Sequence, residues 1–212
     1  MKLAAFGDSW TYGSELPHNE FPYAKYVADH FNADYFNFAQ ESTSVPHMFL
    51  QLQTAIQELQ GKFTALFGVT SISRSWYYNE FSETWSEIMI GSKSSPGPIM
   101  AYYKYLHSDE LDKMNYNIYL LALQKICDEH NIDAYFIGAW NRIHKLNLPG
   151  GSNLKIYEKS MAQILGIDSE LAEISEIDDN FYIKPNVNHP NPDGHRAIAA
   201  KITQWIENVS PL

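Results

Sequence analysis

The sequence predicts a three-layer α/β domain, in which helices cover both faces of a mostly parallel β-sheet. Two patterns predict this fold class. Short apolar runs, typical of strands buried on both faces, alternate with segments whose apolar residues recur at helical spacing. The length of 212 residues and the 45% of hydrophobic residues suit one domain with a sizeable core, so we expect residues 1–212 to form a single domain.

Strands and helices alternate through the first third of the chain. Lys2 to Phe6 is an apolar run that stops at Gly7, which predicts the first strand. Further apolar runs predict strands at about 33–39 and 63–69, and apolar residues at helical spacing predict helices at about 21–31 and 45–59. This alternation is the main evidence for the layered fold.

The second half of the chain continues the pattern after an interruption. Ser108 is expected to cap a long helix over about 108–130, because acidic residues fill its first turn and complement the helix dipole. A fourth strand is expected at about 133–139, a loop at 149–152, and helices at about 157–165 and 193–209. Asp193 fits the N-cap of the last helix.

The charge balance and the hydropathy exclude two classes of function. Lys and Arg number 15 against 25 Asp and Glu, which gives a formal net charge of −10 without any basic run. Such a surface repels phosphate backbones, so we expect no nucleic-acid partner. No stretch approaches the ~20 apolar residues that cross a bilayer, and the N-terminal apolar run is too short for a signal peptide. We therefore expect a cytoplasmic protein without a membrane partner; its oligomeric state is open, and a homodimer is one option.

The single cysteine, Cys127, excludes an intrachain disulfide and a multi-cysteine zinc site. It lies in an apolar helical pattern, which favours a buried structural thiol. His189, Asp193 and His195 could together ligate a metal, but the expected helical position of His195 disfavours this arrangement. We expect neither a metal nor another cofactor.

The polar residues that could carry chemistry lie where parallel strands end, which is where such folds bind ligands. The expected loops at this edge are 7–13, 39–44 and 68–74. Ser9 lies between two glycines in the first loop, so its hydroxyl is expected at the edge of the sheet, although such a turn can also be purely structural. In the proline-braced loop 186–195, His189 is a candidate general base for Ser9.

Two segments resemble known motifs. Residues 7–13 read Gly-Asp-Ser-Trp-Thr-Tyr-Gly, which resembles the first block, Gly-Asp-Ser-x-Thr-x-Gly, of the SGNH or GDSL hydrolase superfamily. Residues 189–195 read His-Pro-Asn-Pro-Asp-Gly-His and resemble its last block. The resemblance implies a flavodoxin-like α/β/α sandwich and serine hydrolysis of esters. It also implies Ser9 as nucleophile and first oxyanion donor through its amide, with His189 as base.

Two oxyanion positions depart from the pattern of this superfamily. Ser42 aligns with a glycine whose amide donates to the oxyanion, and its own amide can do so if the backbone adopts the required angles. Thr70 stands where the superfamily has an asparagine donor, and its hydroxyl is shorter. Loss of one oxyanion donor typically lowers the rate by about 10²–10³-fold.

The acid of the triad is also replaced. Asn186 stands three residues before His189, where the superfamily has an aspartate. An asparagine can accept a hydrogen bond from the imidazole but cannot stabilise the imidazolium, a loss of about 10⁴ in the serine-protease example. Either another carboxylate replaces it, or Ser9 and His189 act as a dyad, or the protein has little activity. Asp178 and Asp179 are candidates for that acid, although a solvated acidic turn is the simpler interpretation.

An aromatic-rich insertion at about 71–107 interrupts the pattern of strands and helices. It would lie over the Ser9 edge, where aromatic faces could stack on sugars or acyl chains. A small local core or a homodimer contact explains the same composition equally well. Arg74 could bind an anionic group of the substrate or simply pair with a carboxylate. We expect the substrate contacts at Trp10, Arg74, Trp76 and Tyr77.

The leading hypothesis is a serine ester hydrolase of SGNH type, acting on a small ester or an acylated carbohydrate, for example as a deacetylase. The first alternative is a degraded SGNH scaffold that acts as a glycan-binding or structural protein, because several motif positions are substituted. A second alternative is an acyltransferase, with the same Ser9 chemistry and an alcohol in place of water. The presence or absence of a carboxylate at the His189 imidazole discriminates between the enzyme and the binding protein.

Overall fold

A five-stranded parallel sheet forms the centre of the protein. The computed structural model describes residues 1–72, 74–79, 84–89, 105, 108–143, 154–167, 182–184 and 187–210. The strand order is β2-β1-β3-β6-β7, and every neighbouring pair is parallel. These strands are β1 (Lys2–Gly7), β2 (Asp34–Asn37), β3 (Thr64–Val69), β6 (Asp133–Gly138) and β7 (Lys155–Ile156).

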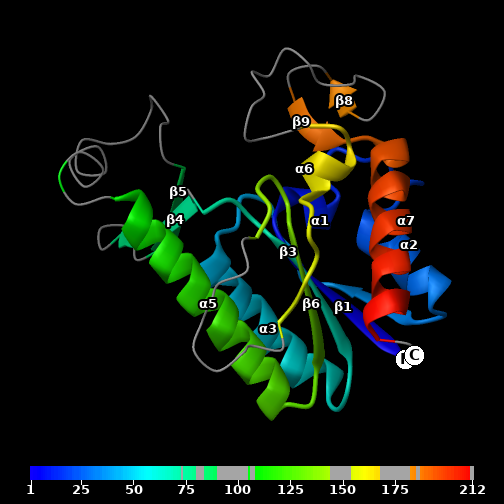
Figure 1. The fold of residues 1–212 in the computed structure, drawn as a ribbon, viewed down its shortest axis with the longest axis horizontal. Coiled ribbons are helices and arrows are strands. Elements are labelled where there is room, and N and C mark those ends of the chain that lie inside the picture. The colour runs from blue at the N-terminus through cyan, green and yellow to red at the C-terminus, as the bar shows by residue number, and fades with distance from the viewer. Residues whose placement is uncertain are drawn as a thin grey trace.

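Helices cover both faces of this sheet, as Figure 1 shows. On one face α3 (Val45–Leu59) packs beside α5 (Asp109–Glu129), and on the other α2 (Tyr23–His30) packs beside α7 (Pro192–Val209). Two short helices, α1 (Ser9–Tyr12) and α6 (Met161–Ile164), lie near the end of the sheet where β1 and β3 finish (Figure 1). The predicted three-layer α/β/α architecture is confirmed.

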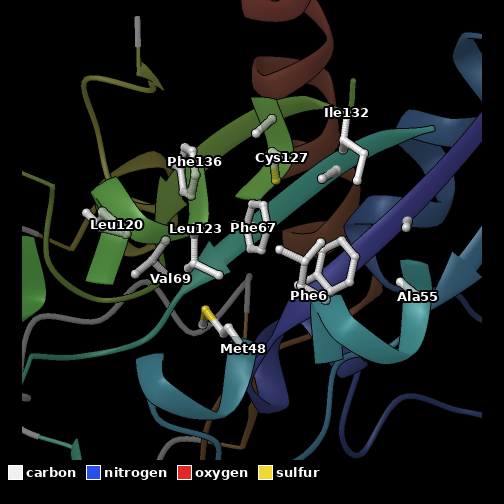
Figure 2. Close-up of a cluster of buried hydrophobic side chains, with 14 of the residues drawn as sticks. Phe6, Met48, Ala55, Phe67, Val69, Leu120, Leu123, Cys127, Ile132 and Phe136 are labelled. Carbon is white, nitrogen blue, oxygen red and sulfur yellow. The ribbon is translucent and has the colours of Figure 1, made fainter. Parts of the chain in front are cut away.

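The apolar runs form strands because each strand is buried on both sides. In β1, Leu3 and Ala5 point to the α2–α7 layer, whereas Ala4 and Phe6 point to the α3–α5 layer. Residues of β3 and β6 alternate in the same way, so both faces of the sheet are lined mainly by apolar side chains. Figure 2 shows the apolar cluster between the sheet and the α3–α5 layer. In it the Phe67 ring stacks on Phe6 and on Phe136, with 4.8 Å between ring centroids in each pair.

Two local predictions on α5 are confirmed. The Ser108 side chain caps the helix, because its Oγ accepts a hydrogen bond from the Leu111 amide at 3.1 Å. Cys127 is fully buried in the cluster between α5 and the sheet (Figure 2), and burial raises the pKa of its thiol to about 12. A thiol this hard to ionise is a packing group and not a nucleophile.

The C-terminal prediction needs correction. The expected loop 186–195 contains a strand, β9 (Val187–Pro190), which pairs antiparallel with β8 (Tyr182–Lys184). The N-cap of α7 is Asn191 and not Asp193, because Pro192 occupies the first helical position and the Asn191 side chain accepts from the Gly194 amide at 2.9 Å. Asp193 lies in the first turn and pairs with Arg196.

Other differences concern short elements. The aromatic insertion contains an antiparallel pair, β4 (Arg74–Asn79) and β5 (Thr84–Met89), and β4 packs against α3. The helix expected at 157–165 is reduced to α6, because Ser160 caps it and starts it at Met161. The loop expected at 149–152 lies outside the described residues. Within the described part of the chain, no helix is long and apolar enough to cross a membrane.

Candidate functional site

The site begins at Gly7, where β1 ends. Gly7 has φ +151°, and a Cβ there would lie 2.5 Å from Thr11 Oγ1 and 2.6 Å from the Gly68 carbonyl oxygen. The side-chain amide of Gln51 holds the backbone of Gly7 on both sides. Its Oε1 accepts from the Gly7 N–H at 3.0 Å, and its Nε2 donates to the Gly7 carbonyl at 3.1 Å. Only glycine fits this junction, so the chain leaves the strand in one defined direction.

Ser9 is the first residue of α1, a single turn whose two ends are defined by Asp8 and Gly13. Asp8 is its N-cap, with Oδ1 accepting from the Trp10 amide at 3.1 Å. Gly13 ends the turn in the left-handed conformation, and its amide donates to the Ser9 carbonyl at 3.0 Å. The result places Ser9, 6% exposed, at the carboxyl end of a central strand.

Thr11 locks this turn onto the sheet. Its Oγ1 shares a hydrogen bond of 3.1 Å with the Tyr23 hydroxyl, and both residues are fully buried. A Cβ on Gly68 would lie 1.9 Å from the same Thr11 oxygen, so the glycine of the neighbouring strand makes room for it. The threonine and the glycines of residues 7–13 therefore hold the geometry of Ser9.

A buried polar network lies behind the serine. Thr70 Oγ1 donates to Asp8 Oδ2 at 2.8 Å, and Arg74 Nη1 lies 3.5 Å from the same oxygen. Arg74 Nη1 also donates to the Thr43 carbonyl at 3.4 Å. Burial raises the pKa of the Asp8 carboxyl, while the Arg74 charge and the Thr70 hydrogen bond oppose the rise. Thr70 and Arg74, two expected site residues, thus meet at Asp8.

Ser42, which aligns with a glycine of the superfamily, has a left-handed backbone. Its φ is +58°, in the left-handed region that glycine enters most easily. The loop around it is tied to the loop of Ser9, because Thr43 Oγ1 and the Gln40 amide donate to the Gly7 carbonyl at 2.8 and 3.1 Å. Ser42 therefore lies in a left-handed turn held against the loop that carries Ser9.

His189 comes from β9, which packs against α1. Its Nδ1 lies 3.5 Å from Glu15 Oε2, and the side chains are 24% and 41% exposed. This Nδ1 is a buried atom without a hydrogen-bond partner among the residues that the structure describes. A carboxylate thus faces the imidazole nitrogen, and it comes from the loop after α1. Sequence reasoning missed Glu15, since the contact joins two distant segments.

His195 has a structural position. Its ring is 1% exposed and stacks parallel to Tyr23 at 6.2 Å, and its Nδ1 accepts a hydrogen bond from the Tyr23 amide at 3.2 Å. Burial, and then the nearby His189, lower the pKa of His195 to about 3, so this ring is neutral. His195 therefore joins α7 to α2. In the described part of the chain, no three His, Cys, Asp or Glu side chains form a group that could hold a metal.

The remaining expected residues divide into three groups. Trp10 is 1% exposed in the core, with its ring 4.8 Å from that of Trp140, so it packs the loop of Ser9 against the core and presents no face to a substrate. Trp76 and Tyr77 lie on β4, of which the structure describes the backbone. Asn186, Asp178 and Asp179 lie outside the described residues.

Neither a family model nor a curated protein matches the sequence. The fold, in contrast, is similar to that of solved structures. A G-D-S-L family protein from Desulfitobacterium hafniense DCB-2 superposes with a TM-score of 0.57 at 11% identity, covering 96% of this chain and 98% of that one. A member of the lipolytic protein G-D-S-L family from Veillonella parvula DSM 2008 gives a TM-score of 0.53 at 13% identity, covering 96% and 97%. The chain therefore has the fold of the GDSL proteins, as the motifs imply.

Proposed function

We propose that the protein is a serine ester hydrolase in which Ser9 is the nucleophile and His189 the general base. One observation carries the proposal: Ser9, at the end of a central strand, starts a helix against which the His189 strand packs. The imidazole faces a carboxylate through Nδ1, which leaves Nε2 to take a proton. The GDSL-type fold supports the same assignment.

The chemistry follows from these positions. Ser9 Oγ attacks the ester carbonyl while His189 takes the hydroxyl proton, and a tetrahedral oxyanion forms. When this intermediate collapses, His189 returns the proton to the leaving alcohol, and an acyl group remains on Ser9. A water molecule activated by the same imidazole then hydrolyses the acyl-enzyme and regenerates the serine. No cofactor takes part in this sequence.

The oxyanion is stabilised by two backbone amides in this proposal. They are those of Ser9 and Ser42, and the left-handed backbone of Ser42 supports its assignment. The Thr70 hydroxyl has a single proton, which it donates to Asp8. We therefore assign Thr70 to holding Asp8, in place of the third donor that its alignment implies.

The substrate class follows from the residues after β3. Arg74 reaches Asp8 beside the nucleophile, and the strand β4 that begins at Arg74 carries Trp76 and Tyr77. Aromatic faces stack on sugar rings and acyl chains. We assign to the site a small ester or an acylated carbohydrate, with deacetylation as the simplest reaction.

Labelling with a fluorophosphonate probe tests the proposed nucleophile and base without knowledge of the substrate. Intact mass is measured for the wild type, Ser9→Ala and His189→Ala, with Ser108→Ala as a matched control, because Ser108 caps α5 as Ser9 starts α1. We expect one adduct on the wild type and the control, and none on the other two variants. No adduct under conditions that label a known serine hydrolase would contradict the proposal and favour a glycan-binding scaffold, which a glycan array then tests.

A further inference from the structure

The loop that follows α1 brings a carboxylate to the proposed base. Glu15 Oε2 lies 3.5 Å from His189 Nδ1, within ion-pair distance and slightly beyond a hydrogen bond. In a serine–histidine–acid arrangement the acid meets Nδ1, and Nε2 faces the serine. Contacts of this kind are often long without substrate and tighten in the reacting complex. Glu15 thus lies at the nitrogen that a triad acid must reach.

From this geometry we infer that Glu15 is the acid of the site, a positioning residue that orients the His189 imidazole and stabilises its charged form. The inference rests on the proposed function and names the residue that completes it. It also explains why position 186 can be an asparagine: with the Glu15 carboxylate at His189, the aspartate that the superfamily has at this position is unnecessary. A triad is defined by the geometry of its groups and not by their places in the sequence.

The neighbouring carboxylates have other partners. The Asp8 carboxylate is engaged by the Trp10 amide, Thr70 and Arg74. Glu20 binds Arg196 and the Tyr26 hydroxyl, and Glu41 accepts from the Ser14 hydroxyl. Among the described residues, the contact of Glu15 with His189 is the single ion pair or hydrogen bond of the Glu15 side chain. Glu15 is therefore the carboxylate available to the imidazole.

The backbone at Glu15 is a second, independent observation. Its φ is +66°, in the left-handed region where glycine is most easily accommodated and a long side chain is uncommon. Left-handed non-glycine residues have an energetic cost and concentrate at functional sites. A glutamate at a position that would suit glycine is explained if its carboxylate is needed at His189.

This backbone angle allows a sharp test. Glu15→Gly removes the carboxylate and relieves the left-handed backbone, so the fold is expected to keep or raise its Tm. Glu15→Gln keeps the side-chain shape without the charge. Glu20→Gln is the matched control, since Glu20 lies in the same loop and pairs with Arg196. The rate of fluorophosphonate addition to Ser9 is measured for each variant by intact mass, with and without added sodium formate.

We expect Glu15→Gly and Glu15→Gln to label at least about tenfold more slowly than the wild type, and Glu20→Gln to label at the wild-type rate. Formate is expected to restore part of the rate in Glu15→Gly, where it can occupy the space of the lost carboxylate, but not in Glu15→Gln. Rescue by a small carboxylate with an unchanged Tm would support the positioning role, because a purely structural defect would not respond to formate.

Three results would overturn the inference. Wild-type rates in both Glu15 variants would refute it and leave the proposed function standing, above all if Asp178→Asn or Asp179→Asn slowed labelling instead. A slower rate with a lower Tm and without rescue by formate would assign Glu15 a structural role. Absence of labelling in the wild type itself would refute the proposed function and, with it, the acid at Glu15.

Discussion

At the scale of single residues, the geometry of Ser9 depends on groups that are not themselves reactive. Gly7 and Gly68 make room for Thr11, and Asp8 and Gly13 define the two ends of the turn that presents the serine. The contacts of Gly7, Gly68 and Asp8 are buried, so the serine is held by packing and hydrogen bonds that a substitution cannot easily replace.

Gly7→Ala tests this packing. The added Cβ would lie 2.5 Å from Thr11 Oγ1 and 2.6 Å from the Gly68 carbonyl, and the backbone angle also disfavours alanine. We expect a loss of about 3 kcal/mol or more in the free energy of unfolding. Urea denaturation measures it. Gly61→Ala is the control: Gly61 has φ +90° but no atom within 4 Å of the added Cβ, so about 1 kcal/mol is expected. Equal losses would show that the contacts with Thr11 and Gly68 do not matter.

The residues of the candidate site were predictable to different degrees. Ser9 and His189 could be identified as candidates from the sequence, because each lies in a local motif, residues 7–13 and 189–195. Glu15 could not, because its relevance depends on a contact with His189 across the fold. Thr70 was expected to serve the oxyanion; its 2.8 Å hydrogen bond to Asp8, which the sequence does not reveal, is the reason why we propose that it holds Asp8 instead.

At the scale of elements, α7 and α2 are joined through a histidine that does not carry a charge. His195 accepts from the Tyr23 amide at the start of α2 and is buried between the helices. An imidazolium could not accept that hydrogen bond, and it would lie unsolvated in an apolar layer. Protonation therefore opposes the packing of the two helices that cover one face of the sheet.

Stability is expected to fall with acidification. Because the folded protein holds the pKa of His195 at about 3, against 6.5 for an unperturbed histidine, the unfolded chain binds more protons between these values. His195 alone then removes up to about 1.4 kcal/mol per pH unit as the pH falls from 6.5 towards 3. The raised pKa of Asp8 acts in the opposite direction, because the folded state holds that proton more tightly.

The His195 contribution is isolated by a variant. His195→Asn retains a side-chain acceptor for the Tyr23 amide but does not titrate, and it leaves Asp8 in place. The free energy of unfolding is measured in urea at several pH values from 7 to 4. We expect the variant to be less stable at pH 7 and to show a shallower loss on acidification. Parallel pH dependences of the two proteins would contradict the account of His195.

The elements themselves were predicted where packing against the sheet determines them. The runs that form β1, β3 and β6 are buried on both faces, so their composition is diagnostic. The strands β4 and β9 were missed. They pair with β5 and β8 outside the main sheet, and their sequences contain no apolar run like those of the central strands. The cap of α7 was misplaced because Pro192 shifts the start of the helix to follow Asn191.

At the scale of the whole molecule, the layered fold brings distant segments to one edge of the sheet. Ser9 follows the first strand, Ser42 belongs to the loop that follows β2, and His189 arrives from the C-terminal ribbon of β8 and β9. Parallel strands all end at the same edge, so loops from different parts of the sequence can meet there. The fold class and the loops expected at this edge follow from the sequence pattern, whereas the contact of Glu15 with His189 follows from the folded structure alone.

A crystal structure of the protein after reaction with a fluorophosphonate tests the central claim most directly. The account predicts phosphorus bonded to Ser9 Oγ, with the phosphonyl oxygen within hydrogen-bond distance of the Ser9 and Ser42 amides and the His189 ring beside the adduct. Phosphorus on another residue, or a phosphonyl oxygen directed away from both amides, would contradict the assignment of this edge of the sheet as a hydrolase site.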